Sequence, residues 1–338
     1  MNIDRKIAEK IKLSQNENPL GPSPMAYKAI SEQCNTINRY PEVHSVTLKS
    51  ELASHLELST ENIFVSAGLV EALDIMIRNF IVKGENLIIP KLTFVAYRLL
   101  AKVFNVETRF SKMKDYRIDV DSIIENYNNQ TKLIIIANPN NPTGNIITEK
   151  ELIKLMESVS QQTYVAIDEA YCEYVSDEDY PNTLKLQKEY PNLIVMRTFS
   201  KIYGLAGLRV GYVIASKEII KQFDYYQPPF TVNKMATIAA SAALKDKQFV
   251  KDSFEMNLAG RAFLEKELLI LGYNVVSSQS NFIFVFFNEQ EDQDKIFNKL
   301  ASNNVIARKM GPFGDFKAFR ITISKLENCQ KIIDCLRH

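Results

Sequence analysis

Histidine and cysteine are scarce in this sequence, which holds three histidines and four cysteines in 338 residues. No two cysteines form a C-x-x-C pair, and this scatter is typical of reduced thiols rather than of a disulfide framework: Cys34, Cys172, Cys329 and Cys335. The three histidines are equally scattered: His44, His55 and His338. Few residues are therefore available for a zinc site or for a nucleophile activated by histidine. We therefore expect no metal site, and we expect that any reaction depends on a bound reactive group.

An excess of one charge and long apolar runs are also missing. The 41 Lys and Arg residues against 40 Asp and Glu residues leave a formal net charge of +1, unlike the basic footprint of a general nucleic-acid-binding protein. No apolar run approaches the roughly 18 to 20 residues that cross a bilayer, and the opening MNIDRKIAEKIKLSQ has no apolar segment of a secretion signal. The sequence thus predicts a cytoplasmic protein without a nucleic-acid or membrane partner.

The pattern between residues 60 and 215 predicts an α/β fold. Short apolar runs rich in β-branched residues alternate there with stretches of helical period, which is typical of a mostly parallel central sheet with helices on both faces. The runs are mostly continuous, as in strands buried on both faces: Asn62 to Val65, Asn86 to Pro90, Lys132 to Ala137, Tyr164 to Ile167, Asn192 to Met196 and Arg209 to Ala215. Crossover helices are expected near 69–80 and from Thr148, as a cap, to Val159.

The length favours one large domain and one smaller domain. After about residue 228 the pattern predicts a long helical stretch from Lys234 to Leu271, followed by strands at Asn281 to Phe287 and Ala318 to Ser324 among charged helices. The first thirty residues hold too many turn formers for a regular element, and we expect an ordered arm there. We therefore predict an N-terminal arm, partly in the small domain, at 1–30, a large domain at 31–232 and a small α+β domain at 233–338.

Three successive strand ends carry residues that suit chemistry. Asn141 lies in PNNPTG after one buried run, Asp168 ends the next, and Lys201 follows a third. Ligands of open α/β folds bind at this edge, a buried carboxylate needs a partner, and a lysine leaving a buried strand suits Schiff-base chemistry. Each residue also has a purely structural interpretation: a turn, a helix cap and a solvated loop lysine, respectively. The three together on successive strands favour a site.

These motifs resemble a known family. The sequence contains three motifs in the following order: NPNNPTG, AIDEAY and TFSKIYGLAGLRVGY. Their order, and the spacings of 27 and 33 residues between Asn141, Asp168 and Lys201, resemble those of fold-type I pyridoxal-phosphate enzymes. LSQNENPLGPSP, RYP, PKLTFVAYR and AFRITIS extend the resemblance over nearly the whole chain, and it is strongest to the histidinol-phosphate aminotransferases. The resemblance implies pyridoxal 5'-phosphate as the cofactor, bound by the large domain.

The resemblance also assigns the residues around the cofactor ring. Lys201 would bind the cofactor aldehyde and later shuttle a proton as general base and acid. Asp168 would pair with the ring nitrogen and keep it protonated, so that the ring accepts electrons. Asn141 and Tyr171 correspond to the hydrogen-bond partners of the phenolic oxygen, and Phe94 corresponds to the aromatic that stacks on the ring. Outside this family context, a single Phe is more often ordinary core packing.

The cofactor phosphate requires an anion site. The turn containing Gly68 and Leu69 joins a strand to a helix, so backbone N–H groups at a helix N-terminus can meet a phosphate. The resemblance completes this cradle with three further side chains: Thr198, Ser200 and Arg209. Tyr40 resembles the tyrosine that reaches the phosphate from the neighbouring subunit, which implies a homodimer with a shared active site. A surface aromatic beside a proline gives the same local pattern.

Substrate residues are expected on the strand at 318–324, whose alternation places Arg320, Thr322 and Ser324 on one face. An edge strand with a solvated face has the same pattern. The resemblance assigns Arg320 to a substrate carboxylate or phosphate and Arg308 to a substrate phosphate. Asn16, in the arm, would line the substrate entrance. Two arginines at one pocket favour a phosphorylated substrate.

The resemblance implies transfer of an amino group between L-histidinol phosphate and 2-oxoglutarate, as in histidine biosynthesis. Val70 stands where the family has an acidic residue, and the chain offers no evident counterpart of the tyrosine-containing arm of many relatives. An aromatic-amino-acid aminotransferase and a phosphothreonine-type decarboxylase are therefore alternatives within the fold. A regulatory protein that binds pyridoxal phosphate is the alternative from another class, and the near-neutral charge disfavours it.

Overall fold

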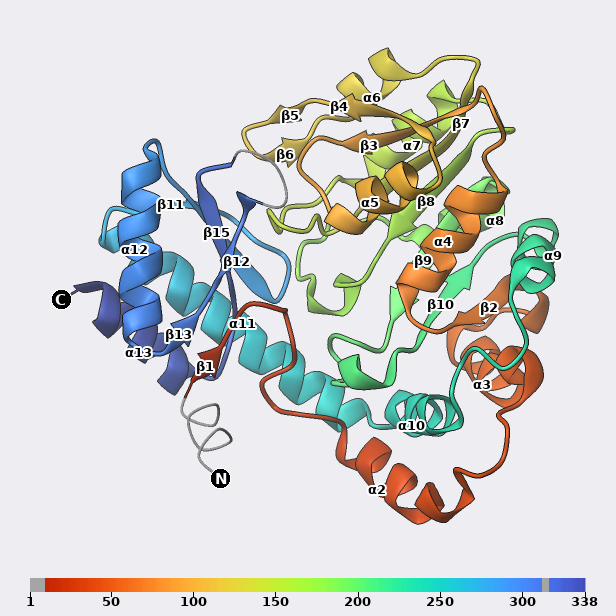
Figure 1. Ribbon diagram of the computed structural model, residues 1–338, viewed down its shortest axis with the longest axis horizontal. Coiled ribbons are helices and arrows are strands. Elements are labelled where there is room, and N and C mark those ends of the chain that lie inside the picture. Colours follow the sequence, from red (N-terminus) through yellow and green to blue (C-terminus); the bar gives the residue numbers. More distant parts are fainter. Residues whose placement is uncertain (1–9, 312–315, 338) are drawn as a thin grey trace.

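The computed structural model describes residues 10–311 and 316–337, and a seven-stranded sheet forms its centre (Figure 1). The strand order is β2-β10-β9-β8-β7-β3-β4, and β10 is antiparallel to both of its neighbours while the other pairs are parallel. The strands span β2 Ile63–Ser66, β3 Asn86–Pro90, β4 Glu107–Ser111, β7 Thr131–Ala137, β8 Tyr164–Asp168, β9 Leu193–Thr198 and β10 Gly211–Ile214. The predicted α/β class with a mostly parallel sheet is confirmed.

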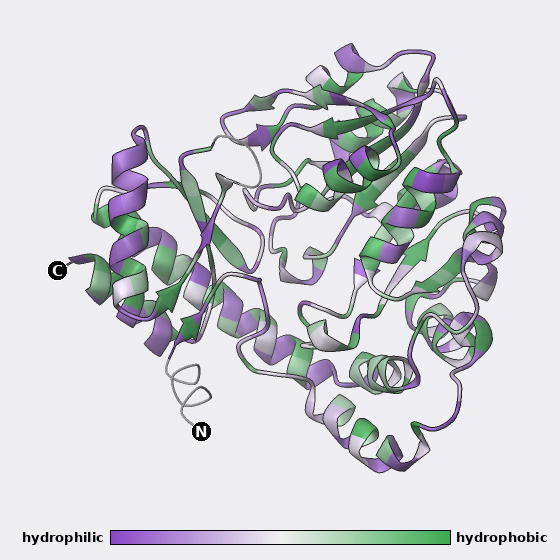
Figure 2. Cartoon of the chain, viewed as in Figure 1, coloured by the Kyte–Doolittle hydropathy of each residue, from purple (hydrophilic) through white to green (hydrophobic). Residues whose placement is uncertain are grey.

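Helices cover both faces of this sheet. One face packs against α4 (Leu69–Asn79), α5 (Val95–Val103) and α9 (Lys217–Tyr226), whereas the other packs against α3 (Val46–Leu56), α7 (Glu149–Ser158), α8 (Thr183–Glu189) and α10 (Lys234–Lys245). The central strands are mostly green, that is apolar, in Figure 2, as expected when alternate side chains enter two separate cores. The predicted cap of α7 is also present, because Thr148 and Glu151 form a reciprocal capping box.

A second sheet lies on the other side of the molecule, with strand order β11-β12-β15-β14. Its strands span β11 Asn274–Val276, β12 Phe282–Phe286, β14 Arg308–Lys309 and β15 Ala318–Thr322. Three helices pack their apolar faces against it: α11 (Lys247–Ile270), α12 (Gln290–Ser302) and α13 (Leu326–Arg337). In Figure 1, α11 runs from this sheet toward α10 beside the larger one. The proposed domain boundary near residue 232 stays a prediction.

Smaller elements complete the chain. Strand β1 (Ile11–Lys12) pairs with β13 (Val305–Ile306), and β5 (Met113–Lys114) pairs with β6 (Arg117–Ile118). The remaining helices are α2 (Pro24–Gln33) and α6 (Val120–Asn126), and the short 3-10 turns are Cys34–Thr36, Val43–Ser45, Thr60–Asn62, Cys172–Tyr174 and Ala206–Leu208. In the described part of the chain, no helix has the length and apolarity that crossing a bilayer requires.

Four sequence expectations differ from the structure. The stretch from Lys234 to Leu271 is two helices, because the backbone of Asp246 leaves helical geometry and its side chain caps α11. The arm is not free of regular structure, since β1 lies in it and Ser23 caps α2; its residues 1–9 lie outside the described residues. Strand β4 was not predicted. The alternative of a solvated edge strand at 318–324 is wrong, because β15 pairs with a strand on each side and is buried throughout.

Candidate active site

A cavity of about 320 Å³ lies at the carboxyl ends of β7, β8 and β9 and faces β14 and β15 of the second sheet. Segments far apart in the sequence meet there, as expected at the ligand-binding edge of an open α/β sheet. Its lining comprises Ser14, Gln15, Asn16, Leu69, Val70, Phe94, Val95, Tyr97, Ala137, Asn141, Asp168, Ala170, Tyr171, Thr198, Ser200, Lys201, Arg209, Arg308 and Arg320. Asp168 is the only carboxylate among these described lining residues.

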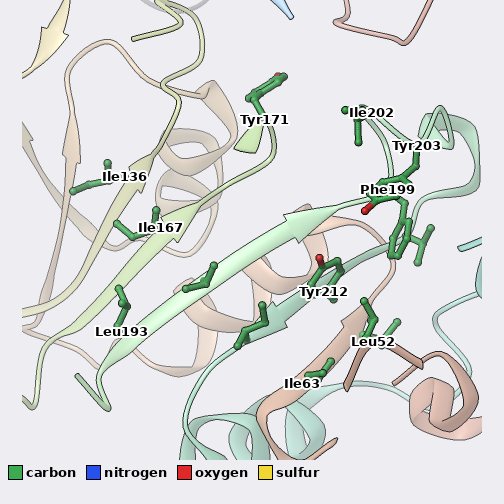
Figure 3. Packing of buried hydrophobic residues seen from close by; sticks show 14 of the residues in the cluster. Leu52, Ile63, Ile136, Ile167, Tyr171, Leu193, Phe199, Ile202, Tyr203 and Tyr212 are labelled. Atoms are coloured by element: carbon green, nitrogen blue, oxygen red, sulfur yellow. The ribbon is translucent and has the colours of Figure 1, made fainter. Parts of the chain in front are cut away.

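The turn after β9 positions Lys201 at this cavity. Phe199 and Ile202, on either side of Ser200 and Lys201, are fully buried and fix the turn to the core of the large sheet (Figure 3). The Lys201 Nζ donates a hydrogen bond to the Gln15 carbonyl at 3.2 Å. Burial of the amine, followed by the charge of Arg320, lowers the pKa of Lys201 to about 7. In a large fraction of the molecules, the Lys201 amine is therefore neutral and nucleophilic at neutral pH.

Asp168 ends β8 and is only 5 % exposed. Its Oδ2 accepts a hydrogen bond from the Tyr97 hydroxyl at 2.7 Å, and its Oδ1 accepts one from the Ala170 backbone N–H at 3.1 Å. Burial raises the pKa of the Asp168 carboxyl, while these two hydrogen bonds and the charge of Lys201 oppose the shift. A buried carboxylate in this position suits a cationic partner such as a protonated ring nitrogen.

A polar cluster surrounds the hydroxyl of Tyr171, which is 4 % exposed. That hydroxyl lies 2.9 Å from the Asn16 Nδ2 and 3.4 Å from the Asn141 Nδ2, and both amides donate to it. Asn16 belongs to the arm, and its backbone N–H and carbonyl bind Thr322 and Asn281 of the second sheet region. The arm therefore fixes the Tyr171 hydroxyl in place, next to the amide of Asn141.

The turn between β2 and α4 forms an anion cradle with Arg209. Gly68 has a φ of +77°, and a Cβ added there would collide with the Arg209 guanidinium, so only glycine allows this close approach. Arg209 in turn donates to the Ser200 Oγ at 3.3 Å, and the Ser200 N–H donates to the Thr198 Oγ1 at 3.1 Å. One guanidinium, two hydroxyls and the N-terminus of α4 thus converge in a manner that suits a phosphate.

Two arginines face each other across the β14–β15 pair. Arg308 and Arg320 are register partners, and both line the cavity. Arg320 is 5 % exposed and donates to the Asn141 Oδ1 at 2.5 Å and the Ser14 carbonyl at 2.9 Å, whereas its Nε has no partner within the described residues. Burial lowers the pKa of Arg320 to about 10. Neither guanidinium forms an ion pair with a carboxylate within the described residues, so an anionic ligand is the expected partner.

Together these groups fit pyridoxal phosphate. The cavity supplies a neutral amine for an aldehyde, a buried carboxylate for a ring nitrogen, donors for a phenolic oxygen and a cradle for a phosphate. The family model for aminotransferase class I and II matches residues 8–336. The chain belongs to this aminotransferase family. It is therefore a pyridoxal-phosphate-dependent aminotransferase, and the predicted family, enzyme class and cofactor are confirmed.

Relatives of this aminotransferase share nearly its whole length. A histidinol-phosphate aminotransferase from Brevibacillus brevis is 40% identical over 332 residues, which cover 98% of this chain and 90% of that protein. The crystal structure of a histidinol-phosphate aminotransferase from Clostridium acetobutylicum has a TM-score of 0.88 at 27% identity and covers 97% of this chain and 98% of that one. The crystal structure of a histidinol-phosphate aminotransferase from Sinorhizobium meliloti, in complex with pyridoxal 5'-phosphate, has the same fold. Its TM-score is 0.90 at 23% identity, and the match covers 99% of this chain and 93% of that one.

Most predicted site residues meet in this one cavity of the aminotransferase. They are Asn16, Leu69, Phe94, Asn141, Asp168, Tyr171, Thr198, Ser200, Lys201, Arg209, Arg308 and Arg320. Gly68 is not part of the lining and adjoins it through Arg209. Tyr40 lies elsewhere: it is 82 % exposed, its ring centroid is 4.9 Å from that of Phe230, and it borders a separate cavity beside α2, α3 and α10. The individual roles of these residues stay predictions.

The sequence prediction missed several residues of the cavity lining, and Tyr97 and Gln15 are two of them that bind predicted catalytic residues. Tyr97 lies three residues after Phe94 in the PKLTFVAYR motif, one helical turn away, and this spacing is the signal that could have found it. Gln15 contributes only its backbone carbonyl to Lys201. A carbonyl is present in every residue, so no residue type could have indicated it.

Proposed function

We propose that this aminotransferase moves the amino group of L-histidinol phosphate to 2-oxoglutarate and forms imidazole acetol phosphate and L-glutamate. The curated relatives that support this substrate carry the name histidinol-phosphate aminotransferase at 36 to 40% identity. The single structural observation in favour is the pair Arg308 and Arg320, which are register partners at the cavity and form no ion pair with a carboxylate within the described residues. This reaction places the enzyme in histidine biosynthesis.

The arginine pair favours a substrate with a phosphate group. A phosphate carries up to two negative charges and three acceptor oxygens, so it can engage two guanidinium groups at once. Arg320, with its unpaired Nε, lies on the cavity side of β15, and Arg308 faces it from β14. A carboxylate such as that of glutamate, the second substrate, can use Arg320 alone. Both half-reactions can therefore share one pocket.

The chain's own residues divide the work of proton transfer and binding. When bound, the cofactor supplies an electron-accepting ring that stabilises negative charge at the substrate carbon. Lys201, whose amine has a lowered pKa, takes the proton from the substrate Cα and returns a proton as general acid. Asp168 would hold positive charge on the ring nitrogen, and Tyr171 and Asn141, which contact each other, would donate to the phenolic oxygen. Arg209 and Ser200, which are hydrogen-bonded to each other, would hold the phosphate of the cofactor.

We further infer that the active unit is a homodimer in which Tyr40 reaches the phosphate site of the neighbouring subunit. The exposure of Tyr40 and its distance from its own chain's cavity lining support this arrangement. Large exposed apolar side chains on the same part of the molecule also suit a subunit interface: Met25, Tyr27, Ile37, Val43, Val46 and Phe230.

Steady-state kinetics with Arg308→Ala test the substrate. We expect kcat/KM for histidinol phosphate to fall roughly 10- to 100-fold, the size expected for a lost hydrogen-bonded charge pair, while that for phenylalanine changes little. Arg78→Ala, at the far end of α4 and in an exposed ion pair with Asp74, is the matched control and should leave both values unchanged. Equal losses for both substrates would contradict a phosphate-binding pocket.

Product analysis on the wild-type enzyme separates the alternative reactions. Transamination yields a keto compound and glutamate, whereas a phosphothreonine-type decarboxylase releases carbon dioxide. We expect the keto product from histidinol phosphate, and no carbon dioxide from phosphothreonine. Carbon dioxide release at a comparable rate would replace the proposed function with the decarboxylase.

A further inference from the structure

Tyr97 is a buried tyrosine whose hydroxyl binds the Asp168 carboxylate in the candidate active site. It lies in the first turn of α5, it is fully buried, and its hydroxyl donates to the Asp168 Oδ2 at 2.7 Å. None of the roles assigned above includes this residue. Its hydroxyl is nevertheless a side-chain donor to the one carboxylate among the described lining residues.

We propose that Tyr97 is a positioning residue that holds the Asp168 carboxylate ionised and in a fixed orientation for the ring nitrogen of pyridoxal phosphate. The proposal rests on the pyridoxal phosphate site and goes beyond it by naming the group that maintains its counter-ion. Within the described residues, each Asp168 oxygen has one donor, the Ala170 N–H on Oδ1 and the Tyr97 hydroxyl on Oδ2. The two donors together fix the rotation of the carboxylate as well as its position.

The hydroxyl opposes the effect of burial on Asp168. Burial favours the neutral acid and raises the pKa of that carboxyl, and the hydrogen bond from Tyr97 is the largest influence in the opposite direction. The charge of Lys201 also favours the carboxylate, whereas the charge of Glu169 disfavours it. Without the hydroxyl, Asp168 is more easily protonated. A neutral acid does not hold positive charge on a ring nitrogen.

The ring of Tyr97 has a second contact in the same turn. The Phe94 and Tyr97 ring centroids lie 5.5 Å apart with an interplanar angle of 87°, and the Tyr97 N–H donates to the Phe94 carbonyl at 3.2 Å. An edge-to-face pair of this kind is stabilising and orients both rings. The start of α5 thus orients two side chains of the cavity lining, the Phe94 ring and, through the Tyr97 hydroxyl, the Asp168 carboxylate. Phenylalanine at position 97 keeps the ring contact and removes only the hydroxyl.

The test compares cofactor affinity in a double-mutant cycle with Tyr97→Phe and Asp168→Asn. The dissociation constant of pyridoxal phosphate is measured by fluorescence titration of each apoprotein. We expect Tyr97→Phe to weaken binding roughly tenfold or more, as for a lost hydrogen bond to a charged group, and to add little in the Asp168→Asn background. Tyr164→Phe, at the other end of β8, is the matched control and should bind with wild-type affinity.

The pH profile of kcat in the holoenzyme gives a second readout that loosened packing would not produce. Because loss of the hydroxyl raises the pKa of Asp168, activity in Tyr97→Phe should disappear at a higher pH than in the wild type as the pH falls. We expect kcat to decrease with KM for the amino donor within about twofold. Wild-type affinity in Tyr97→Phe, equal weakening in both backgrounds or an unshifted acid limb would overturn the proposal.

Discussion

Lys201 and Asp168 show how burial prepares an active-site residue before any ligand binds. Burial favours the neutral form of each group, and it therefore lowers the pKa of the amine and raises that of the carboxyl. For the carboxylate, two hydrogen bonds resist the change. For the amine, the adjacent Arg320 reinforces it, and the pKa of Lys201 is about 7. The same cavity thus holds the Lys201 amine, whose pKa is lowered, and the Asp168 carboxylate, which accepts two hydrogen bonds.

The rate of cofactor capture should depend on pH through Lys201. Only the neutral amine attacks an aldehyde, so capture by the apoprotein should be slow below the pKa of about 7 and should reach a plateau above it. Stopped-flow absorbance with apoprotein and pyridoxal phosphate over a range of pH measures this rate. Pyridoxal, which lacks the phosphate, serves as a control for ionisation of the phosphate group. A rate that still rises tenfold per pH unit above about 8, as for an ordinary lysine, would contradict the lowered pKa.

Individual site residues were predictable from the sequence where they stand at strand ends in specific motifs, as Asn141, Asp168 and Lys201 do. Tyr97 was not predicted because its side chain is used from within a helix, where a buried aromatic usually means core packing. Gln15 was not predicted because it acts through its backbone. Chemistry carried by side chains in turns is therefore visible in the sequence, whereas a buried neighbour such as Tyr97 shows only through its spacing from a known site residue.

The turn from β2 to α4 has a backbone geometry on which the predicted phosphate site depends. Gly68 precedes α4 with a φ of +77° and a ψ of 163°, a region in which other residues are strained. The space that a Cβ would need is taken by the Arg209 guanidinium. The turn therefore brings the Arg209 guanidinium close to the backbone at the start of α4, where an anion can bind.

Gly68→Ala should weaken cofactor binding by more than its loss of stability explains. We expect a cost of about 1–3 kcal/mol in the free energy of unfolding, and a loss of cofactor affinity of roughly tenfold or more because Arg209 must move. Gly272→Ala is the matched control, since it has a φ of +82° but an added Cβ meets nothing within 4 Å. Thermal melting and fluorescence titration measure the two effects. Equal cofactor affinities in both variants would contradict a phosphate cradle at Gly68.

Among the elements, the strands of the large sheet were predicted because a short continuous apolar run rich in β-branched residues is typical of a strand buried on both faces. Strand β4 was missed because it lies at the sheet edge and two of its five residues are exposed, so its pattern is not apolar. The break at Asp246 was missed because both flanking segments have helical period and no glycine or proline separates them. The buried position of β15 was not visible either, because Arg320 and Thr322 are polar although the folded chain buries both.

At the scale of the whole molecule, the site is assembled from both sheets and the arm. Lys201 and Asp168 come from the large sheet, Arg308 and Arg320 come from the small one, and Asn16 bridges them. Tyr40 does not reach this cavity within its own chain. A second subunit is thus needed for its predicted contact with the phosphate.

Mixed dimers test this shared site. Tyr40→Ala and Lys201→Ala should each lower activity strongly, yet mixing and reassociating the two inactive proteins should restore roughly a quarter of the wild-type activity. Half of the reassociated dimers are then mixed, and each of these holds one site with an intact Lys201 and an intact Tyr40. Ultracentrifugation verifies that the proteins are dimers. Absence of restored activity in confirmed mixed dimers would contradict a contribution of Tyr40 across the interface.

The central claim is that the Lys201 ε-amine forms the covalent bond to pyridoxal phosphate. The most direct measurement is borohydride reduction of the cofactor-saturated protein, followed by mass spectrometry of its peptides. We predict an absorbance band near the violet edge of the visible spectrum before reduction, and the cofactor attached to Lys201 afterwards. Lys201→Ala should remain folded and lack both signals. A colourless wild-type protein, or a label on another lysine, would contradict this claim.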